Sequence, residues 1–585
     1  MLLLLGLLSV IAYGNSIHNS FLWDDHVLVT NNNYIRNHHY LPMVFRSDLF
    51  HNDFGSAARY YRPIQTVTYM ADYALWGLNP DGYHLTNLFL QLACVLLLAL
   101  LLEQLAANRL VAFIVAGLFA VHPVLTNAVT YIAGRADSLA FFGMLAAWLL
   151  WLRRRPLFFV ASALCYVLAL CSRENAFLFP LLIVLHSRLL DRNEWHRVLL
   201  DALPFALLAT AFVFWRNAVL SLGGNVTTVS WSLPWTVRLQ IPFRALATYL
   251  GLLFWPAHLQ MERQVVLGGA WLRVLTTAGV LAVAGLVVLA RRNRLACFGV
   301  CWFVLTLLPL SGLFSLNATV AEHWLYVPCA GLFLGVVSVV PLGRGAMIMA
   351  VAVLTALAAR TIVRNTDWRD AITFYERTKT AAPYSAAVRS NLGLELVAAG
   401  RTNGALSELR NAERLAPDSI HASDNLAAIY LKQGNLDKAQ GKVADALRLD
   451  PHNPNALARA AMIWEQRGDV RRARLYYLRA LAQTLNVPLR LEYAEFLARQ
   501  RRLAEALQIA EEACALEPPN ANAHNLRGVV LAESSRFDEA QLAFETARKL
   551  DRHSPNAAQN LARLRALRDK PHQAASPAAG GASLR

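Results

Sequence analysis

Apolar runs separated by short polar stretches fill the first 364 residues, whereas the rest of the chain mixes apolar and polar positions with a helical period. A membrane-spanning helix needs about 20 mostly apolar residues. The runs that approach this length and composition lie near 86–105, 110–126, 138–152, 157–171, 176–190, 198–215, 240–256, 271–290, 295–312, 324–341 and 345–363. We therefore predict a polytopic membrane domain at 1–364, followed by a helical domain outside the bilayer.

The opening run, residues 1–13, is apolar but short for a complete crossing. It has neither a basic start nor a small-residue cleavage site, which argues against a signal peptide. We interpret it as a first helix whose true start was lost to a late start codon, so that 11 or 12 spans are expected. The polar stretch at 15–83 is then one long external loop.

Small residues recur in the C-terminal part of the chain. Ala371, Ala405, Ala439, Ala473, Ala506 and Ala540 follow one another at steps of 34, 34, 34, 33 and 34 residues. Within one period, Leu426, Ala427, Tyr430, Gly434, Ala446 and Pro451 also match the spacing of a tetratricopeptide repeat, a pair of packed helices. We predict a half repeat, five full repeats over about 386–554 and a capping helix from Asn556, together occupying 365–569. The fold class is all-α.

Such an array forms an α-solenoid, whose concave surface commonly holds an extended partner. Only "RNT" separates the last apolar run from the half repeat, so we expect the solenoid to be mounted rigidly on the membrane domain. The last stretch, 570–585, is rich in Ala, Ser and Gly and has the composition of a disordered tail.

Composition agrees with a membrane protein, because 56% of the residues are hydrophobic and only 16% are charged. The net charge of +16 does not indicate nucleic-acid binding, since many basic residues lie in clusters between apolar runs, at 153–155, 188–197 and 291–294. These clusters are typical of cytoplasmic loops. Six of the seven cysteines lie in or beside apolar runs, which favours packing over disulfide or metal chemistry.

Counting back from the cluster at 153–155 places the 15–83 loop on the outer side of the membrane. Arginine outnumbers lysine, which is typical of a GC-rich bacterial genome, so we expect a bacterial inner membrane and a periplasmic loop. The stretch 198–290 lies between two basic clusters and must contain an even number of crossings, yet it holds three apolar runs. One of these runs is expected to be split or re-entrant.

Five polar islands interrupt or border the apolar runs, at 21–25, 60–65, 122–137, 171–177 and 321–328. Charged side chains at a membrane boundary are costly and commonly serve function. The islands contribute the carboxylates of Asp24, Asp25, Asp137, Glu174 and Glu322 and the cations of Arg62, Arg135 and Arg173. The topology count places the first four islands on the side of the 15–83 loop.

Carboxylates and arginines around one membrane face suit transfer of a sugar from a phosphorylated lipid. The lipid tail stays in the hydrocarbon, while arginines bind its phosphate in bidentate fashion. A carboxylate removes the proton from an acceptor hydroxyl as that oxygen attacks the anomeric carbon. Cations stabilise the charge that develops on the leaving phosphate. A single base with in-line displacement inverts the anomeric centre.

Sequence motifs in the islands point to a family. The stretches "FLWDD", "YRPIQTVTYMADYALWGLNPDGYHLTN", "LFAVHPVLTNAVTYIAGRADSLA", "SRENAFLFP" and "EHWLYVPCAGL", in this order and before a tetratricopeptide tail, resemble the GT-C glycosyltransferases of the transmembrane and tetratricopeptide-repeat O-mannosyltransferase type, including bacterial relatives. The resemblance covers almost the whole chain. It implies a polyprenyl-phosphate sugar donor, usually mannose, and an active site outside the cytoplasm. It also implies that Asp24 is the base and that Asp25 assists in acceptor or metal binding.

We assign the donor phosphate to Arg62, Arg135, Arg173 and His323, and a supporting role to Asp137, Glu174, Glu322 and His84. Two positions depart from the family pattern. His323 stands where an arginine is common, and a histidine binds phosphate in a pH-dependent way. Arg173 stands where a lysine is frequent, which keeps the charge.

Each assignment has a structural alternative. Asp24 and Asp25 can belong to a solvated interfacial turn, and Arg62 can extend its charge toward water from an apolar surface. Arg135 and Asp137 can form a salt bridge that locks a loop, and Glu174 can be the partner of Arg173. For His84 we favour a hydrogen bond to a neighbouring carbonyl over contact with the donor.

The sequence therefore predicts an inverting membrane hexosyltransferase that moves a sugar from a polyprenyl phosphate to a protein Ser or Thr hydroxyl, with the repeats docking the acceptor. A transferase with a lipid or glycan acceptor and a non-catalytic scaffold that assembles partners through its repeats are the alternatives. No cofactor is required, although Asp24 and Asp25 can hold an optional Mg²⁺ or Mn²⁺ ion.

Overall fold

The computed structural model describes residues 1–50, 60–221, 238–261, 263, 270–311, 320–552 and 555–569. Over these residues the fold is all-α, as predicted, and the one β-type pairing is an isolated bridge between Arg263 and Val320. The chain divides into two compact units. The predicted disordered tail, 570–585, lies outside the described residues, as does the 51–59 part of the predicted external loop.

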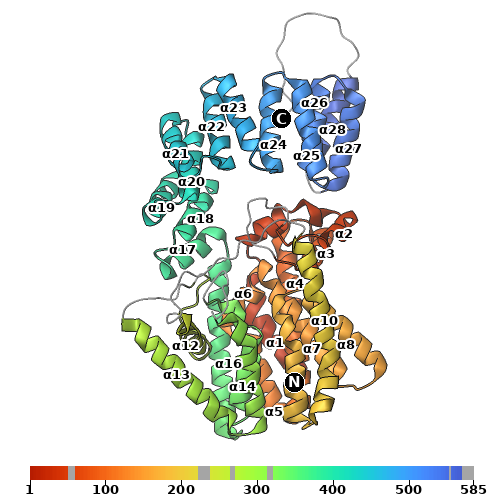
Figure 1. Cartoon of the computed structure of the whole chain (residues 1–585), viewed down its shortest axis with the longest axis vertical. Helices are drawn as coiled ribbons and strands as arrows, with labels where there is room; N and C mark the ends of the chain where they lie inside the picture. Colours follow the sequence, from red (N-terminus) through yellow and green to blue (C-terminus); the bar gives the residue numbers. More distant parts are fainter. Residues whose placement is uncertain are drawn as a thin grey trace, which may run out of the picture. The chain divides into compact units, whose positions relative to one another are not determined.

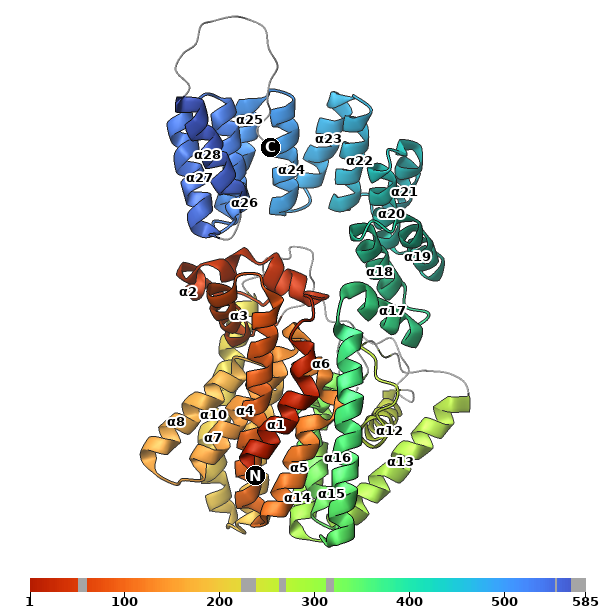
Figure 2. The same cartoon turned by 180° about the vertical axis from the view of Figure 1, so that it is seen from behind.

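Unit 1 contains, among the described residues, 1–30, 44–50 and 60–384. Its helices are α1 (Leu2–Tyr13), α3 (Pro63–Trp76), α4 (Pro80–Ala106), α5 (Arg109–Val121), α6 (Thr126–Val129), α7 (Arg135–Trp151), α8 (Pro156–Leu170), α9 (Phe179–Leu185), α10 (Trp195–Ser221), α12 (Ile241–Phe254), α13 (Ala270–Ala290), α14 (Arg294–Leu307), α15 (Pro328–Val337), α16 (Arg344–Asn365) and α17 (Ala371–Ala381). The short helix α2 (Leu41–Val44) lies at the division between the units. Several long helices of unit 1 run side by side, and α1 packs among α4, α5 and α16 (Figures 1 and 2).

Five described helices are long and apolar enough to cross a membrane, and the bent pair Arg109–Val121 and Pro123–Val129 makes a sixth candidate. Five shorter apolar helices accompany them. Each apolar run that the sequence singled out contains a helix. Among the three runs of the 198–290 stretch, α12 has 14 residues and therefore a length of only about 21 Å, well short of a hydrocarbon core of about 30 Å.

Local sequence explains where these helices begin and how closely they pack. Asn79 caps α4 by accepting a hydrogen bond from the Asp81 amide, and Pro80 occupies the first helical position. Helices α14 and α15 approach closely because small residues face each other: a Cβ atom added at Gly299 would lie 2.5 Å from the Gly335 nitrogen. Such contacts are typical of helix pairs in membranes.

Unit 2 contains, among the described residues, 31–43 and 385–569. Its helices are α18 (Ala386–Ala398), α19 (Thr402–Leu415), α20 (Ile420–Lys432), α21 (Leu436–Leu449), α22 (Pro454–Gln466), α23 (Val470–Leu481), α24 (Val487–Arg499), α25 (Leu503–Leu516), α26 (Ala521–Glu533), α27 (Phe537–Leu550) and α28 (Pro555–Asp569). They form successive antiparallel pairs, and five of the six periodic alanines, from Ala405 onward, are fully buried between paired helices. Residues 31–43 of the first loop belong to this unit, where the Asn33 side-chain amide donates to Glu517 at 3.0 Å.

Candidate functional site

The acidic doublet lies in the turn that follows α1, and its two carboxylates have different surroundings. Asp25 is 1% exposed, and its two oxygens accept hydrogen bonds from the backbone amides of Leu22 at 2.9 Å and Ala133 at 2.8 Å. Burial raises the pKa of Asp25 well above its ordinary value, and the two amides lower it in part. Asp25 thereby ties the 22–25 turn to the segment before α7.

Asp24 is half-buried, and no backbone amide among the described residues donates to its carboxylate. The Asp24 amide donates to the Tyr131 hydroxyl at 3.0 Å, which places this hydroxyl beside Asp24. Burial raises the pKa of Asp24, while Tyr131 and the charge of Arg62 lower it. The residue before it, Trp23, has a φ of 49°, a left-handed conformation that is strained for a bulky side chain and is found at functional sites.

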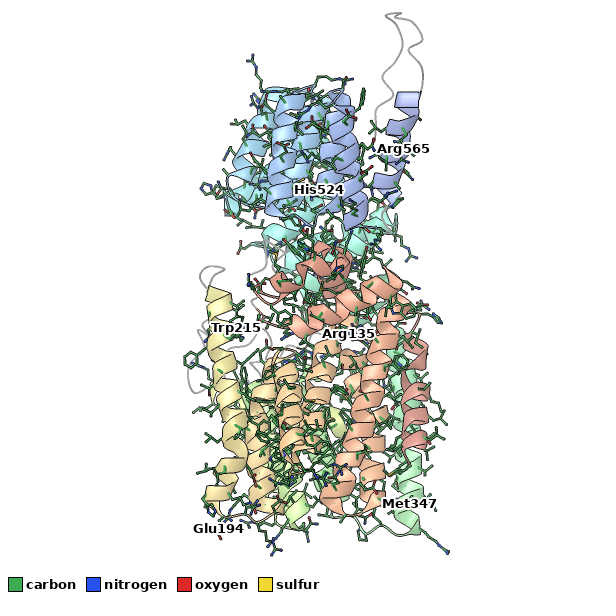
Figure 3. All side chains as sticks on the ribbon, turned by 90° about the vertical axis from the view of Figure 1, so that its right-hand side faces the viewer. Arg135, Glu194, Trp215, Met347, His524 and Arg565 are labelled. Atoms are coloured by element: carbon green, nitrogen blue, oxygen red, sulfur yellow. The ribbon has the colours of Figure 1, made fainter. Side chains whose placement is uncertain are left out.

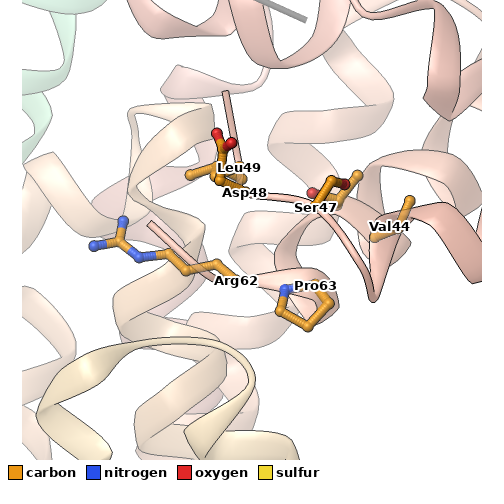
Figure 4. Close-up of a pocket in the computed structure, with 7 residues that line it drawn as sticks. Val44, Ser47, Asp48, Leu49, Arg62 and Pro63 are labelled. Atoms are coloured by element: carbon orange, nitrogen blue, oxygen red, sulfur yellow. The ribbon is translucent and has the colours of Figure 1, made fainter. Parts of the chain in front are cut away.

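Arg62 stands directly before α3 and lies 12% exposed against Glu174. Its Nη2 and Nε atoms donate to Glu174 Oε2 at 2.8 and 3.2 Å, and its guanidinium lies 4.5 Å from the centre of the Tyr60 ring. Burial lowers the pKa of Arg62, but the Glu174 charge outweighs that effect and the pKa is raised. Arg62 also lines a pocket with Ser47 and Asp48 from the first loop (Figure 4).

Arg173 adjoins Glu174 and is paired with Asp137 at 2.8 Å. Burial lowers the pKa of Arg173, and Asp137 offsets this in part. His323, in the turn Glu322–Leu325, lies close to the same two arginines. Burial and then the charges of Arg173 and Arg62 hold the pKa of His323 well below its ordinary value of 6.5, so the imidazole is neutral. The structure thus brings Arg62, Arg173 and His323 together, with two carboxylates as counter-charges.

Arg135 has a different environment from the other two arginines. It is fully buried, and its guanidinium pairs with Asp72 at 2.5 Å, donates to Asn87 at 2.7 Å and donates to the Tyr83 carbonyl at 2.9 Å. It does not pair with Asp137, as the alternative interpretation of this island proposed, because Asp137 is held by Arg173. The donor groups of Arg135 are taken up by interior partners, which favours a structural role over the predicted phosphate contact.

Glu322 and His84 support the surrounding backbone. Glu322 is 1% exposed, accepts from the Gln260 amide at 2.6 Å and lies 3.4 Å from Arg263. Burial raises its pKa. The His84 ring makes a 3.0 Å hydrogen bond with the Asn19 carbonyl, the arrangement that the sequence favoured for it. This bond holds the segment before the doublet against α4.

Two residues of this region, Tyr131 and Asp72, are not indicated by any sequence pattern. Tyr131 lies inside the 122–137 island, but a single uncharged phenol carries no pattern that separates it from the many aromatics of a membrane protein. Asp72 lies in "YMADYAL", and a lone acid in a half-polar helix reads as a surface residue until its partner, Arg135, is seen beside it. Thr86, on the neighbouring helix α4, donates a hydrogen bond to Asp72 at 2.7 Å. The sequence gives no signal for this pair either.

The candidate site lies at one end of unit 1. Figure 3 shows Arg135, at the start of α7, far along the bundle from Glu194 and Met347, which lie at the other end. Glu194 adjoins the basic cluster at 188–197, so the site and this cluster occupy opposite ends of the helices. A half-buried carboxylate near a partly exposed arginine can accept a proton while a neighbouring anion is held.

A divalent ion at the doublet has few ligands to use. Both oxygens of Asp25 already accept backbone hydrogen bonds, and the described residues contain no cluster of three His, Cys, Asp or Glu side chains arranged for a metal. Asp24 is the one member of the doublet whose carboxylate faces a side-chain hydroxyl instead of backbone amides. The predicted optional metal stays a prediction.

Comparison with known proteins supports the assignment of both parts of the chain. A tetratricopeptide-repeat family model matches residues 390–454, 425–488 and 465–521, which confirms the repeats in unit 2. Among solved structures, the PilF protein of Pseudomonas aeruginosa is 28% identical over 26% of this chain and 68% of its own, with a TM-score of 0.24.

Curated relatives extend over the membrane part as well. Protein O-mannosyl-transferase F38B6.6 of Caenorhabditis elegans is 25% identical over 71% of this chain and 62% of its own length. Protein O-mannosyl-transferase Tmtc3 of Drosophila melanogaster is 27% identical over 69% and 54%, and human protein O-mannosyl-transferase TMTC1 is 35% identical over 24% and 16%. The chain spans little more than half the length of the first two relatives. These matches show that the chain is similar to protein O-mannosyl-transferases of the transmembrane and tetratricopeptide-repeat type.

Proposed function

We propose that this protein is an inverting membrane glycosyltransferase that moves a sugar, mannose in the first instance, from a polyprenyl phosphate to a Ser or Thr hydroxyl of a protein. The observation that carries the proposal is that the half-buried Asp24 carboxylate lies near enough to Arg62 for the arginine's charge to lower its pKa, while Glu174 holds Arg62 in place. The relatives are named as protein O-mannosyl-transferases, which supports the choice of sugar and acceptor.

In the proposed reaction the Asp24 carboxylate takes the proton of the acceptor hydroxyl. The hydroxyl oxygen forms a bond to the anomeric carbon while the bond between that carbon and the phosphate oxygen breaks. The lipid phosphate leaves with the electron pair, and Arg62 and Arg173 stabilise its charge. His323 is neutral beside them and is available to donate one hydrogen bond to the phosphate. Glu174 and Asp137 keep the two guanidinium groups in place.

The acceptor is proposed to bind the repeats outside the cytoplasm. Residues 31–43 belong to the same compact unit as the repeats, so the loop that follows the doublet and the solenoid share one side of the membrane. The basic clusters then face the cytoplasm, in line with the positive-inside rule. A pocket among α22, α23 and α24, lined in part by Met462, Tyr477 and Glu492, offers the mixed apolar and acidic surface that an extended peptide can contact.

The test uses the purified full-length protein in lipid nanodiscs with radiolabelled polyprenyl-phosphate mannose and a mixture of periplasmic proteins. We expect label in protein, and we expect Asp24→Asn to lower the rate by about 100-fold or more, as loss of a general base does. Asp81→Asn, which removes an acidic side chain that is 42% exposed at the start of α4, is the matched control and should keep full activity.

The outcomes separate the alternatives. Label in organic-extractable material instead of protein would indicate a lipid or glycan acceptor. An Asp24→Asn protein that folds and fully restores the cellular role of a deletion strain would overturn the catalytic proposal in favour of a scaffold. Chelation, followed by addition of Mg²⁺ or Mn²⁺, tests the optional divalent ion in the same assay.

A further inference from the structure

Aromatic side chains from three separate parts of unit 1 form a cluster beside the acidic doublet. The Tyr131 ring stacks on Trp368 with a centroid distance of 5.4 Å and an interplanar angle of 28°. Trp368 lies 4.9 Å from Phe374, and Trp23 lies 5.9 Å from Phe374 and 6.0 Å from Tyr375. These five residues form a continuous cluster, which we call the aromatic wall. Trp23 is a member of this cluster, and Asp24 is the next residue along the chain.

Four of the five side chains of the aromatic wall are buried, and the wall is anchored. Trp368 is 1% exposed, Phe374 is 3% exposed and Tyr131 is 5% exposed, so each side chain has one packed position. The backbone adds to this, because the Ser20 amide donates to the Arg369 carbonyl at 3.0 Å. Two of the five residues, Phe374 and Tyr375, come from α17, the helix that the sequence assigned to a half repeat.

The strained backbone conformation of Trp23 is stabilised by its surroundings. Its left-handed backbone is held on one side by the aromatic wall and on the other by the two backbone hydrogen bonds to Asp25. A strained conformation persists only when the surroundings define it fully. The Trp23 conformation decides where the next residue, Asp24, projects.

We infer that Tyr131, held by Trp368, is a positioning residue for Asp24, and that the start of the predicted repeat array, residues 366–375, thereby forms part of the catalytic unit. This inference rests on the proposed function of Asp24. The phenol accepts the hydrogen bond of the Asp24 amide, so it holds the Asp24 backbone in place, and it lies near enough to the carboxylate to lower its pKa and favour its ionised form.

The charged and titratable groups around Asp24 come from several elements. Asp25 adjoins it in the turn, Arg62 lies before α3, Tyr131 lies before α7, and Arg135 and Tyr69 face Asp25 from behind. A base must be ionised, so activity rises as the pH rises through the pKa of Asp24. Because the Tyr131 hydroxyl lowers that pKa, its removal moves the acidic limb of the rate profile to higher pH.

The test is the pH dependence of kcat for Tyr131→Phe in the intact protein, in the labelled-mannose assay. This variant keeps the ring that stacks on Trp368 and loses only the hydroxyl. We expect kcat at neutral pH to fall by about 10-fold or more, the size of a lost hydrogen bond to a charged group, and the acidic limb to move up by about one pH unit. The KM for the donor should change little.

Tyr166→Phe is the matched control. Its hydroxyl is buried in unit 1 without a hydrogen-bond partner among the described residues, so its loss should leave the pH profile unchanged. Trp368→Leu removes the stacking surface and is expected to give the same shift of the limb as Tyr131→Phe.

Two results overturn the inference. A wild-type pH profile in Tyr131→Phe, with Asp24→Asn still inactive, would reject the positioning role and leave the proposed function in place. An active Asp24→Asn protein would reject the proposed function itself. The two failures are therefore distinguishable.

Discussion

At the scale of single residues, the three arginines of the polar islands differ in their partners. Arg62 and Arg173 each pair with a carboxylate of the same region, whereas Arg135 is enclosed by Asp72, Asn87 and a carbonyl. An arginine whose donors are all taken up in the interior holds the fold, and one at the edge of a pocket can exchange a partner for a ligand. Arginines of the polar islands therefore have two different environments, one suited to holding the fold and one suited to binding a ligand.

This contrast gives a paired prediction for Arg62→Lys and Arg135→Lys. Lysine keeps the charge but loses the planar fork that makes bidentate contacts. Arg62→Lys should leave the protein folded and raise the KM for the polyprenyl-phosphate donor by about 10-fold, since one charge-assisted contact is lost. Arg135→Lys should instead destabilise the protein by about 1–3 kcal/mol for each buried partner left without a hydrogen bond.

Thermal unfolding in detergent, followed by donor titration, measures both effects. A normal thermal midpoint for Arg135→Lys together with a raised donor KM would return Arg135 to the phosphate site. Unfolding of Arg62→Lys would show that this arginine is structural as well.

At the scale of elements, the repeat pattern was predictable because each repeat reuses the same contacts. The periodic alanines are buried where two helices approach, and a glycine with positive φ ends the first helix in three repeats, at Gly400, Gly434 and Gly468. In the next two repeats the equivalent turns are made by Arg501 and Ser535, which have φ values of 59° and 60°. A left-handed conformation is costly for these residues, so the last repeats carry local strain.

We therefore predict opposite effects for Ser535→Gly and Gly434→Ala. Glycine at 535 relieves the left-handed strain and should stabilise unit 2 by up to about 1 kcal/mol. Alanine at 434 has open space around its Cβ, so its cost is that of the backbone alone, about 1 kcal/mol or more. Thermal unfolding of the intact protein, followed by far-ultraviolet circular dichroism, measures the shifts. A stabilising Gly434→Ala would contradict the assigned backbone conformation.

The helices of unit 1 were predictable for a related reason, whereas the site was predictable only in part. Long apolar runs must be helical in a bilayer, so pattern alone locates them. The doublet and the two paired arginines also stood out, because charge is rare in such surroundings. Tyr131 contacts Asp24, which lies 107 positions before it in the chain, and Asp72 pairs with Arg135, which lies 63 positions after it. Sequence periodicity carries no information about such distant pairs.

At the scale of the whole molecule, the division between the units differs from the boundary between apolar and polar sequence. The last apolar run ends near 363, yet compact unit 1 continues to Tyr384 and includes α17. The reason is packing, because α17 and the turn before it bury Trp368 and Phe374 against Tyr131 and Trp23. An amphipathic helix with the period of a repeat thus completes unit 1.

This placement predicts that truncations on either side of α17 behave differently. A chain that ends after Asn365 loses Trp368 and Phe374, leaves Tyr131 and Trp23 without their packing partners and should lose at least about 3 kcal/mol of stability, the cost of removing one buried aromatic side chain. A chain that ends after Tyr384 keeps the aromatic wall and should retain the thermal midpoint of unit 1 and its donor binding. Size-exclusion profiles after heating in detergent, together with binding of labelled polyprenyl-phosphate mannose, compare the two chains directly. Equal midpoints and equal donor binding would mean that α17 belongs functionally to the solenoid; a loss confined to the shorter chain would mean that the membrane unit needs this helix to hold its acidic doublet in place.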